Sequence, residues 1–224
     1  MFKRLTARVY KIKNSYATVS RVKGVNVYGE KIFKKGSKEL RVWNPKKSKI
    51  AAAMMKGMPL KYIDLLERYD AMLYLGIANG TTASHFSDIA KEDALIYGVE
   101  LSPRSIIDLS ILIEQGRRNI VPILANASYW EHYAPYVEQA DILYVDIAQP
   151  NQTDIALLNA DIFLKDQGYL YLAIKTRSIS ITKKPIEVIK DEISKIKQHG
   201  YNIEFWTRLD PFEKDHGFVI ARKQ

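Results

Sequence analysis

Short runs in which apolar and polar residues alternate fill the first 43 residues of the chain. Segments 7–13, 16–22, 31–33 and 39–43 alternate in this way, and glycines or an Asn-Ser pair separate them. Alternation with a period of two, broken by closely spaced turns, is typical of antiparallel hairpins. The pattern predicts a small antiparallel β domain at the start of the chain. An alanine- and methionine-rich helix is expected to begin at Lys49.

A second pattern begins near residue 72, where short apolar runs alternate with longer helical stretches. The apolar runs lie at 72–78, 95–101, 120–125, 142–148 and 169–175. The helical stretches lie at 81–91, 103–116, 151–165 and 183–198. This alternation predicts an α/β domain with a parallel sheet and helices on both faces. Two last strands, at 202–209 and 217–222, are joined too closely for a helical crossover, so we expect them to be antiparallel.

Charge is distributed unevenly between these two regions. Residues 1–55 carry 15 Lys and Arg residues against two acids, a net charge of +13. Residues 56–224 carry 19 against 23 acids, a net charge of −4. We therefore expect two domains, with a basic β domain over 1–55 and the larger domain over 56–224. The basic segment is either a solvated surface or a surface that contacts a polyanion, most simply nucleic acid.

The composition excludes several kinds of site. The chain has no cysteine and four histidines, and no two histidines have the spacing of a helical zinc site. No apolar run approaches the roughly 18 residues of a membrane-spanning helix, and the first residues do not resemble a signal peptide. We therefore expect a cytoplasmic protein that holds no metal and has no membrane partner.

The segment 73–82 (LYLGIANGTT) is the first candidate for a ligand site, because it follows a strand and opens a helix. Small residues such as Gly76 and Gly80 let a ligand approach the backbone, and Glu100, at the end of the next strand, suits a ribose diol. Ala78 and Thr81 replace two glycines of a dinucleotide motif, and no phosphate-binding lysine is present. S-adenosylmethionine, which has a ribose but no pyrophosphate, fits a loop that has a ribose-binding acid but no phosphate-binding motif. A tight turn without a ligand is the alternative.

Six segments together resemble the fibrillarin family in its short archaeal form. They are NPKKSKIAAA at 44–53, YLGIANGTT at 74–82, YGVE at 97–100, DIAQP at 146–150, IKTRS at 174–178 and DPFEKDH at 210–216. Their order and spacing match along essentially the whole chain. The resemblance implies a class I (Rossmann-like) methyltransferase domain with a seven-stranded, mostly parallel sheet, preceded by a small antiparallel β domain.

The resemblance also implies an activity and a set of partners. Members of the family transfer a methyl group from S-adenosylmethionine to the ribose 2′-hydroxyl of rRNA and, in archaea, of tRNA. They act in a ribonucleoprotein with a box C/D guide RNA, a Nop-domain scaffold protein and a kink-turn-binding protein of ribosomal type. The guide RNA selects the nucleotide by base pairing, so the enzyme need not read the target sequence.

A ribose hydroxyl is a poor nucleophile near pH 7, so this reaction needs a base that takes its proton. Lys175 and Asp146 end adjacent predicted strands and form a candidate pair. As the base, Lys175 would need a pKa lowered from about 10.4 toward roughly 7–8; the alternative is a lysine that merely extends into solvent at a strand end. The resemblance implies that Lys49 is a second catalytic lysine. His216 or Asp215 is the expected fourth member of the cluster.

The expected cofactor contacts lie on the loops that follow the strands. They are Gly76, Gly80, Thr81, Thr82, Glu100, Leu101, Asn126, Ala127, Asp146, Ile147, Ala148 and Gln149. Asn126 stands where the family usually has an acid that meets the adenine amino group.

Two other functions remain open. Asn126 is the one hint of a non-catalytic RNA-binding subunit, and the Asp146/Lys175 pair argues against it. The net charge of +13 over residues 1–55 argues against a small-molecule O-methyltransferase.

Overall fold

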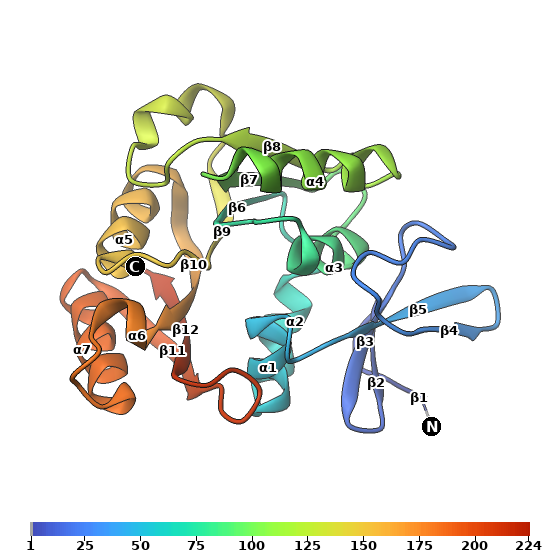
Figure 1. Ribbon diagram of the computed structural model, residues 1–224, viewed down its shortest axis with the longest axis horizontal. Coiled ribbons are helices and arrows are strands. Elements are labelled where there is room, and N and C mark those ends of the chain that lie inside the picture. Colours follow the sequence, from blue (N-terminus) through green and yellow to red (C-terminus); the bar gives the residue numbers. More distant parts are fainter. Residues whose placement is uncertain (1) are drawn as a thin grey trace.

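The computed structural model describes residues 2–224, in which two sheets lie side by side (Figure 1). The first sheet has the strand order β1-β2-β3-β5-β4, and its paired strands are all antiparallel. Its strands are β1 (Phe2–Arg4), β2 (Val9–Ile12), β3 (Ser15–Val19), β4 (Ile32–Lys35) and β5 (Lys38–Trp43). The antiparallel array predicted from the period-two pattern is confirmed.

The second sheet has seven strands within the described residues, in the order β11-β12-β10-β9-β6-β7-β8. They are β6 (Ala71–Leu75), β7 (Leu95–Glu100), β8 (Ile120–Leu124), β9 (Ala140–Val145), β10 (Leu164–Lys175), β11 (Tyr201–Arg208) and β12 (His216–Lys223). Only β12 pairs in the antiparallel sense, with β10 and with β11. The predicted α/β class, the mostly parallel sheet and the antiparallel last pair are confirmed.

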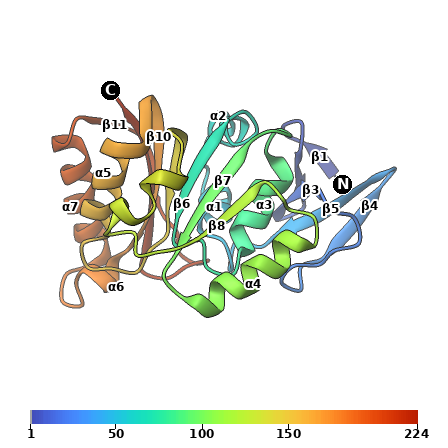
Figure 2. The same cartoon turned by 90° about the horizontal axis from the view of Figure 1, so that it is seen from above.

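Helices cover both faces of this second sheet (Figure 2). The helices are α1 (Lys49–Met55), α2 (Leu60–Leu65), α3 (Thr81–Ile89), α4 (Pro103–Glu114), α5 (Gln152–Phe163), α6 (Thr176–Ile179) and α7 (Pro185–Gln198). Met72 and Tyr74 of β6 pack with helices α1–α4, whereas Leu73 and Leu75 pack with α5 and α7. Successive residues of a strand point to opposite faces, so the uniformly apolar β6 supplies both cores.

Helix α1 belongs to the core of the second sheet, although the charge pattern grouped it with the N-terminal domain. Ile50, Met54 and the alanines between them are buried in one cluster with Tyr74 and Phe218 of the second sheet. The domain boundary expected after residue 55 rests on the distribution of charge along the chain. The last strand of the first sheet ends earlier, at Trp43.

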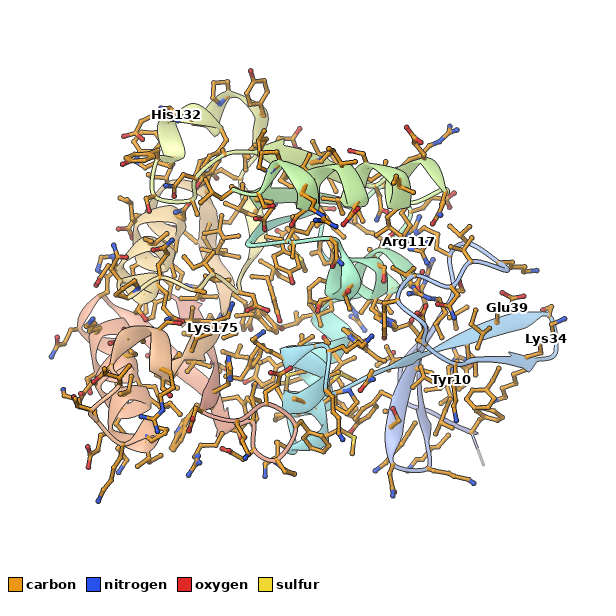
Figure 3. The ribbon with its side chains drawn as sticks, in the orientation of Figure 1. Tyr10, Lys34, Glu39, Arg117, His132 and Lys175 are labelled. Carbon is orange, nitrogen blue, oxygen red and sulfur yellow. The ribbon has the colours of Figure 1, made fainter. Side chains whose placement is uncertain are left out.

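A buried polar cluster joins the two sheets, and Asp88 of α3 is at its centre. The Asp88 carboxylate accepts hydrogen bonds from Arg41 of β5 at 2.6 Å and from Arg117 at 3.2 Å (Arg117 is labelled in Figure 3). It also accepts one from the Thr18 hydroxyl of β3 at 3.0 Å. These ionic side chains are fully buried. Arg41 also donates to Glu30 at 2.6 Å, so the cluster ties the N-terminal sheet to α3.

His85 strengthens the same junction from the preceding turn of α3. Its ring nitrogens lie 2.8 Å from the Thr18 hydroxyl and 2.7 Å from the Tyr28 hydroxyl. The ring stacks on Trp43 with centroids 4.8 Å apart. Burial, reinforced by Arg41 and Arg117, lowers the pKa of His85 well below its ordinary value. A neutral imidazole therefore holds the junction near neutral pH.

Replacing Asp88 should test how strongly this junction depends on the buried charges. The substitution Asp88→Asn leaves Arg41 and Arg117 without their shared counter-charge, and breaking a buried ion pair in this way costs about 3–5 kcal/mol. Denaturant unfolding measures the loss. Asp191→Asn, which removes the exposed partner of Lys183, is the matched control and should change stability by less than about 1 kcal/mol. Equal effects of the two substitutions would contradict the role given to Asp88.

Candidate active site

Three parallel neighbouring strands bring the predicted catalytic residues to one edge of the second sheet. Strand β9 lies between β6 and β10. Gly76 follows β6, Asp146 follows β9 and Lys175 ends β10. Lys175 is labelled in Figure 3, left of the middle of the molecule, and α6 begins at the next residue. The carboxyl ends of such strands are where α/β proteins bind ligands.

Asp146 lies between two lysines that come from distant parts of the chain. Its Oδ2 accepts a hydrogen bond from Lys49 Nζ at 3.0 Å, and its Oδ1 lies 2.9 Å from Lys175 Nζ. Lys175 Nζ directs its hydrogen bond to the Asp146 main-chain carbonyl, also at 2.9 Å. The three side chains are 13% to 20% exposed, so the cluster is mostly buried but accessible. The structure thus brings together three of the predicted catalytic residues.

Lys49 reaches Asp146 because the start of α1 is anchored from two sides. Ser48 precedes the helix, and its Oγ accepts hydrogen bonds from Trp43 Nε1 at 2.9 Å and from the Thr82 hydroxyl at 3.0 Å. The small, fully buried side chains of residues 51–53 let α1 pack closely in the core. The N-terminal sheet and α3 therefore fix the position of this lysine.

Two adjoining cavities meet at the Asp146 cluster. The first, of about 310 Å³, is lined by Gly76, Ala78, Val99, Glu100, Leu101, Ala125, Asn126, Ala127, Asp146, Ile147, Ala148, Gln149, Ile155 and Lys175. The second, of about 240 Å³, is lined by Lys47, Lys49, Tyr74, Gly76, Ile77, Ala78, Asn79, Thr81, Thr82, Asp146 and Lys175. Every expected cofactor residue except Gly80 lines one of them. Asp146 and Lys175 line both, at the place where a ligand in one cavity would meet a molecule in the other.

The two candidate glycines have different roles. Gly76 has a φ of +79°, and a Cβ there would lie 2.8 Å from the Asp146 carbonyl oxygen, so glycine lets β6 and β9 approach at the site. Gly80 lines neither cavity. A Cβ on Gly80 would lie 2.6 Å from a methyl group of Leu112 and 2.7 Å from one of Leu109, so this glycine lets α3 pack against α4.

Main-chain N–H groups hold the side chains of Glu100 and Asn126. Glu100 can still accept further hydrogen bonds, and Asn126 can still donate them. The Glu100 carboxylate accepts from the N–H groups of Ala78 at 2.9 Å and Ser102 at 2.8 Å. The Asn126 Oδ1 accepts from the Ser128 N–H at 2.9 Å. Each carboxylate oxygen of Glu100 keeps a free lone pair, and the amide NH₂ of Asn126 keeps both donors.

The structure places neither candidate for the fourth catalytic residue in the cavities. His216 pairs with Lys175 across β10 and β12, but its Nδ1 lies 2.5 Å from the Lys214 carbonyl oxygen. The Asp215 carboxylate instead accepts a hydrogen bond from Arg177 at 3.2 Å, and its carbonyl accepts from the Thr176 N–H.

Sequence reasoning missed two residues at the cluster. Tyr74, on β6, lines the second cavity; burial, together with the Asp146 carboxylate, raises its pKa well above the ordinary value. Gln152 is fully buried and hydrogen-bonds the main chain of Lys175. Tyr74 lies within an apolar strand, so the sequence pattern predicts a core residue at that position. A glutamine in the first turn of a buried crossover helix is the one signal that could have revealed Gln152.

The donor set of the first cavity fits a nucleoside-containing cofactor. Glu100 offers carboxylate oxygens suited to a sugar diol, and Asn126 has an amide beside the apolar walls formed by Leu101 and Ile147. Asp146 Oδ1 is buried and accepts no hydrogen bond among the described residues. A lysine side chain where the cavities meet can bind a hydroxyl group, and only an amine in its neutral form can accept that group's proton. Residues 2–224 contain no cluster of His, Asp and Glu side chains able to hold a metal, and no helix capable of spanning a membrane.

Comparison with known proteins gives consistent matches along the chain. The family model described as Fibrillarin matches residues 3–224. Proteins named fibrillarin-like rRNA/tRNA 2′-O-methyltransferase match from Sulfurisphaera tokodaii (45% identity; 89% of this chain and 84% of that one) and Aeropyrum pernix (48%; 92% and 86%).

Solved structures agree with these matches. A Methanococcus jannaschii fibrillarin, a pre-rRNA processing protein, has a TM-score of 0.90 at 40% identity, covering 100% of this chain and 97% of that one. Aeropyrum pernix fibrillarin with natively bound S-adenosyl-L-methionine has a TM-score of 0.86 at 44% identity (99% and 97%). A fibrillarin/Nop5p complex contains a chain with a TM-score of 0.85 at 36% identity (99% and 100%).

Proposed function

The chain belongs to the fibrillarin family, and from this premise we propose that it transfers a methyl group from S-adenosylmethionine to ribose 2′-hydroxyls of rRNA and tRNA. The observation that carries this proposal is the Asp146 carboxylate, which contacts Lys49 and Lys175 where the two cavities meet. A non-catalytic RNA-binding subunit would not need this arrangement. The same arrangement is suited to a hydroxyl acceptor in one cavity and a methyl donor in the other.

The first cavity would hold the cofactor through residues on four loops. Glu100 would accept hydrogen bonds from the ribose hydroxyls, and Asn126 and Ala127 would meet the adenine. The segment from Asp146 to Gln149 would hold the methionine end. Thr81 and Thr82 line the second cavity at the start of α3, so they would approach the methionine carboxylate only where the two cavities meet; the helix dipole favours a negative charge there. When bound, S-adenosylmethionine supplies a methyl group already activated on its sulfonium sulfur.

The lysines and Asp146 would then position the acceptor and take its proton. We assign Lys175 Nζ as the group that accepts the proton of the 2′-hydroxyl, since it ends β10 beside both cavities. Asp146 orients this amine through the 2.9 Å contact. Lys49 also pairs with Asp146, at 3.0 Å, so the carboxylate is held between the two lysine side chains. His216 remains a candidate for a supporting role next to Lys175, with its ring turned toward Lys214.

We further propose that the enzyme works in a cytoplasmic ribonucleoprotein. A relative has been solved in complex with Nop5p, so a Nop-domain scaffold protein is the first expected partner. A box C/D guide RNA and a kink-turn-binding protein of ribosomal type complete the proposed assembly. The net charge of +13 over residues 1–55 supports contact with RNA phosphates within it.

A methyl-transfer assay with labelled cofactor tests the function itself. With guide RNA, scaffold and kink-turn protein supplied, the enzyme should label one ribose of a complementary RNA. A matched target with a 2′-deoxy nucleotide at that position should stay unlabelled, because the acceptor oxygen is missing. Labelling of the deoxy target, or labelling that does not depend on the guide, would contradict the proposal.

The substitution Lys175→Ala should abolish transfer while cofactor binding persists. Removing a general base typically costs about 10²–10⁴ in rate. Single-turnover rates in the assembled complex and calorimetric cofactor affinity measure the two quantities. Lys197→Ala, at an exposed position on α7, is the control for loss of a lysine. Equal rates for both variants would exclude Lys175 as the base.

The substitution Asn126→Asp should tighten cofactor binding. The Asn126 oxygen already accepts the Ser128 N–H, so the new second oxygen would face the adenine amino group as a charged acceptor. A charge-assisted bond gains about 1 kcal/mol over a neutral one, or roughly fivefold in affinity. Calorimetry measures this gain, and a cofactor analogue without the adenine amino group should not show it. An equal gain with the analogue would show that residue 126 does not contact that group.

A further inference from the structure

We propose that Gln152 is a positioning residue that holds the main chain of Lys175, and through it the lysine amine, at the Asp146 cluster. The need for such a residue follows from the sheet. Strand β9 pairs with β10 only as far as Leu172, opposite Val145. The last three residues of β10 thus extend beyond their parallel neighbour, and Lys175 is the final one. On the other edge, β12 continues to pair up to Lys175, opposite His216.

The Gln152 side chain replaces the missing strand. Its Oε1 accepts a hydrogen bond from the Lys175 N–H at 2.9 Å, and its Nε2 donates to the Lys175 carbonyl at 3.3 Å. The amide therefore bonds both polar groups of this residue, as a neighbouring strand would. The side chain is fully buried, so water does not compete for these bonds.

The same amide links the lysine to the segment that lines the cofactor cavity. Gln152 Nε2 also donates to the Gln149 carbonyl at 3.0 Å. The Gln152 main-chain N–H donates to that carbonyl as well, at 3.2 Å. Loss of the side-chain amide would leave the Gln149 carbonyl with only the bond from the Gln152 main-chain N–H. It would also remove both hydrogen bonds between Gln152 and the main chain of Lys175.

This arrangement predicts an effect on turnover that exceeds the effect on cofactor binding. A displacement of 1 Å in a reacting group can reduce the rate by about 10²-fold. Asp146 is held separately, through its main-chain N–H to Leu75 at 2.9 Å and its pairing with Lys49. Freeing the end of β10 would thus move Lys175 relative to an unchanged carboxylate.

The inference rests on the proposed function where turnover is measured, and the experiment has a second readout that does not. The substitution Gln152→Met keeps the approximate volume and removes the amide. In the reconstituted complex we expect kcat to fall by about 10- to 100-fold, with much smaller changes in KM and in calorimetric affinity for S-adenosylmethionine. Thr153→Val is the matched control, since the adjacent Thr153 hydroxyl is buried and has no partner within residues 2–224. This control should keep the parent's kcat.

Hydrogen exchange of the Lys175 amide, measured by NMR in the free protein, tests the same bond without any activity. Gln152→Met should accelerate this exchange, while Gln152→Glu, which keeps an acceptor oxygen for the Lys175 N–H, should retain more of the protection. If Gln152→Met does not fold, the same turnover and exchange measurements are made on Gln152→Glu.

Unchanged exchange at Lys175 in a folded variant would overturn the inference. So would a loss of kcat matched by an equal loss of cofactor affinity, or an equal loss in Thr153→Val. If the parent complex transfers no methyl group, the proposed function fails, and the exchange measurement still decides whether Gln152 holds Lys175.

Discussion

The ion pairs that Asp146 makes with two lysines are the interactions on which the rest of the site depends. Lys49 and Lys175 lie 126 positions apart in the sequence, yet each has its amine within 3.0 Å of the same carboxylate. This requires the ends of β9 and β10 and the start of α1 to meet at one point. Gly76, which follows the neighbouring β6, leaves room for Asp146 at this point, because a Cβ there would lie 2.8 Å from the Asp146 carbonyl oxygen.

The N-terminal sheet contributes to the site as well as to the basic surface. Arg41 and Thr18 fix this sheet to α3 through Asp88, and Trp43, at its end, holds Ser48 before α1. The position of Lys49 therefore depends on a buried polar junction outside both cavities. Buried charges are costly to leave unpaired, so the junction holds the basic N-terminal sheet and the Asp146 cluster in a fixed relation.

The sequence predicts strand ends better than it predicts the side chains that hold them. Period and turn signals located β6, β9 and β10, and the parallel order followed, so Asp146 and Lys175 could be paired beforehand. Lys49 came only from the family resemblance, because no local pattern says where α1 packs. Gly80 was predicted from its loop alone, and the pattern gave no sign that a Cβ there would meet Leu109 and Leu112. Gln152 was missed because its three side-chain bonds join groups whose proximity arises only in the folded sheet.

The most direct test of this account is a crystal structure of the assembled complex with S-adenosylmethionine and target RNA, trapped with Lys175→Arg or a slow substrate. The distance that matters joins the target 2′-oxygen to the side-chain nitrogen at residue 175. The account predicts hydrogen-bond reach, about 2.6–3.2 Å, with Asp146 still between residue 175 and Lys49. A target hydroxyl beyond reach of residue 175, with another side chain positioned to take its proton, would contradict the account.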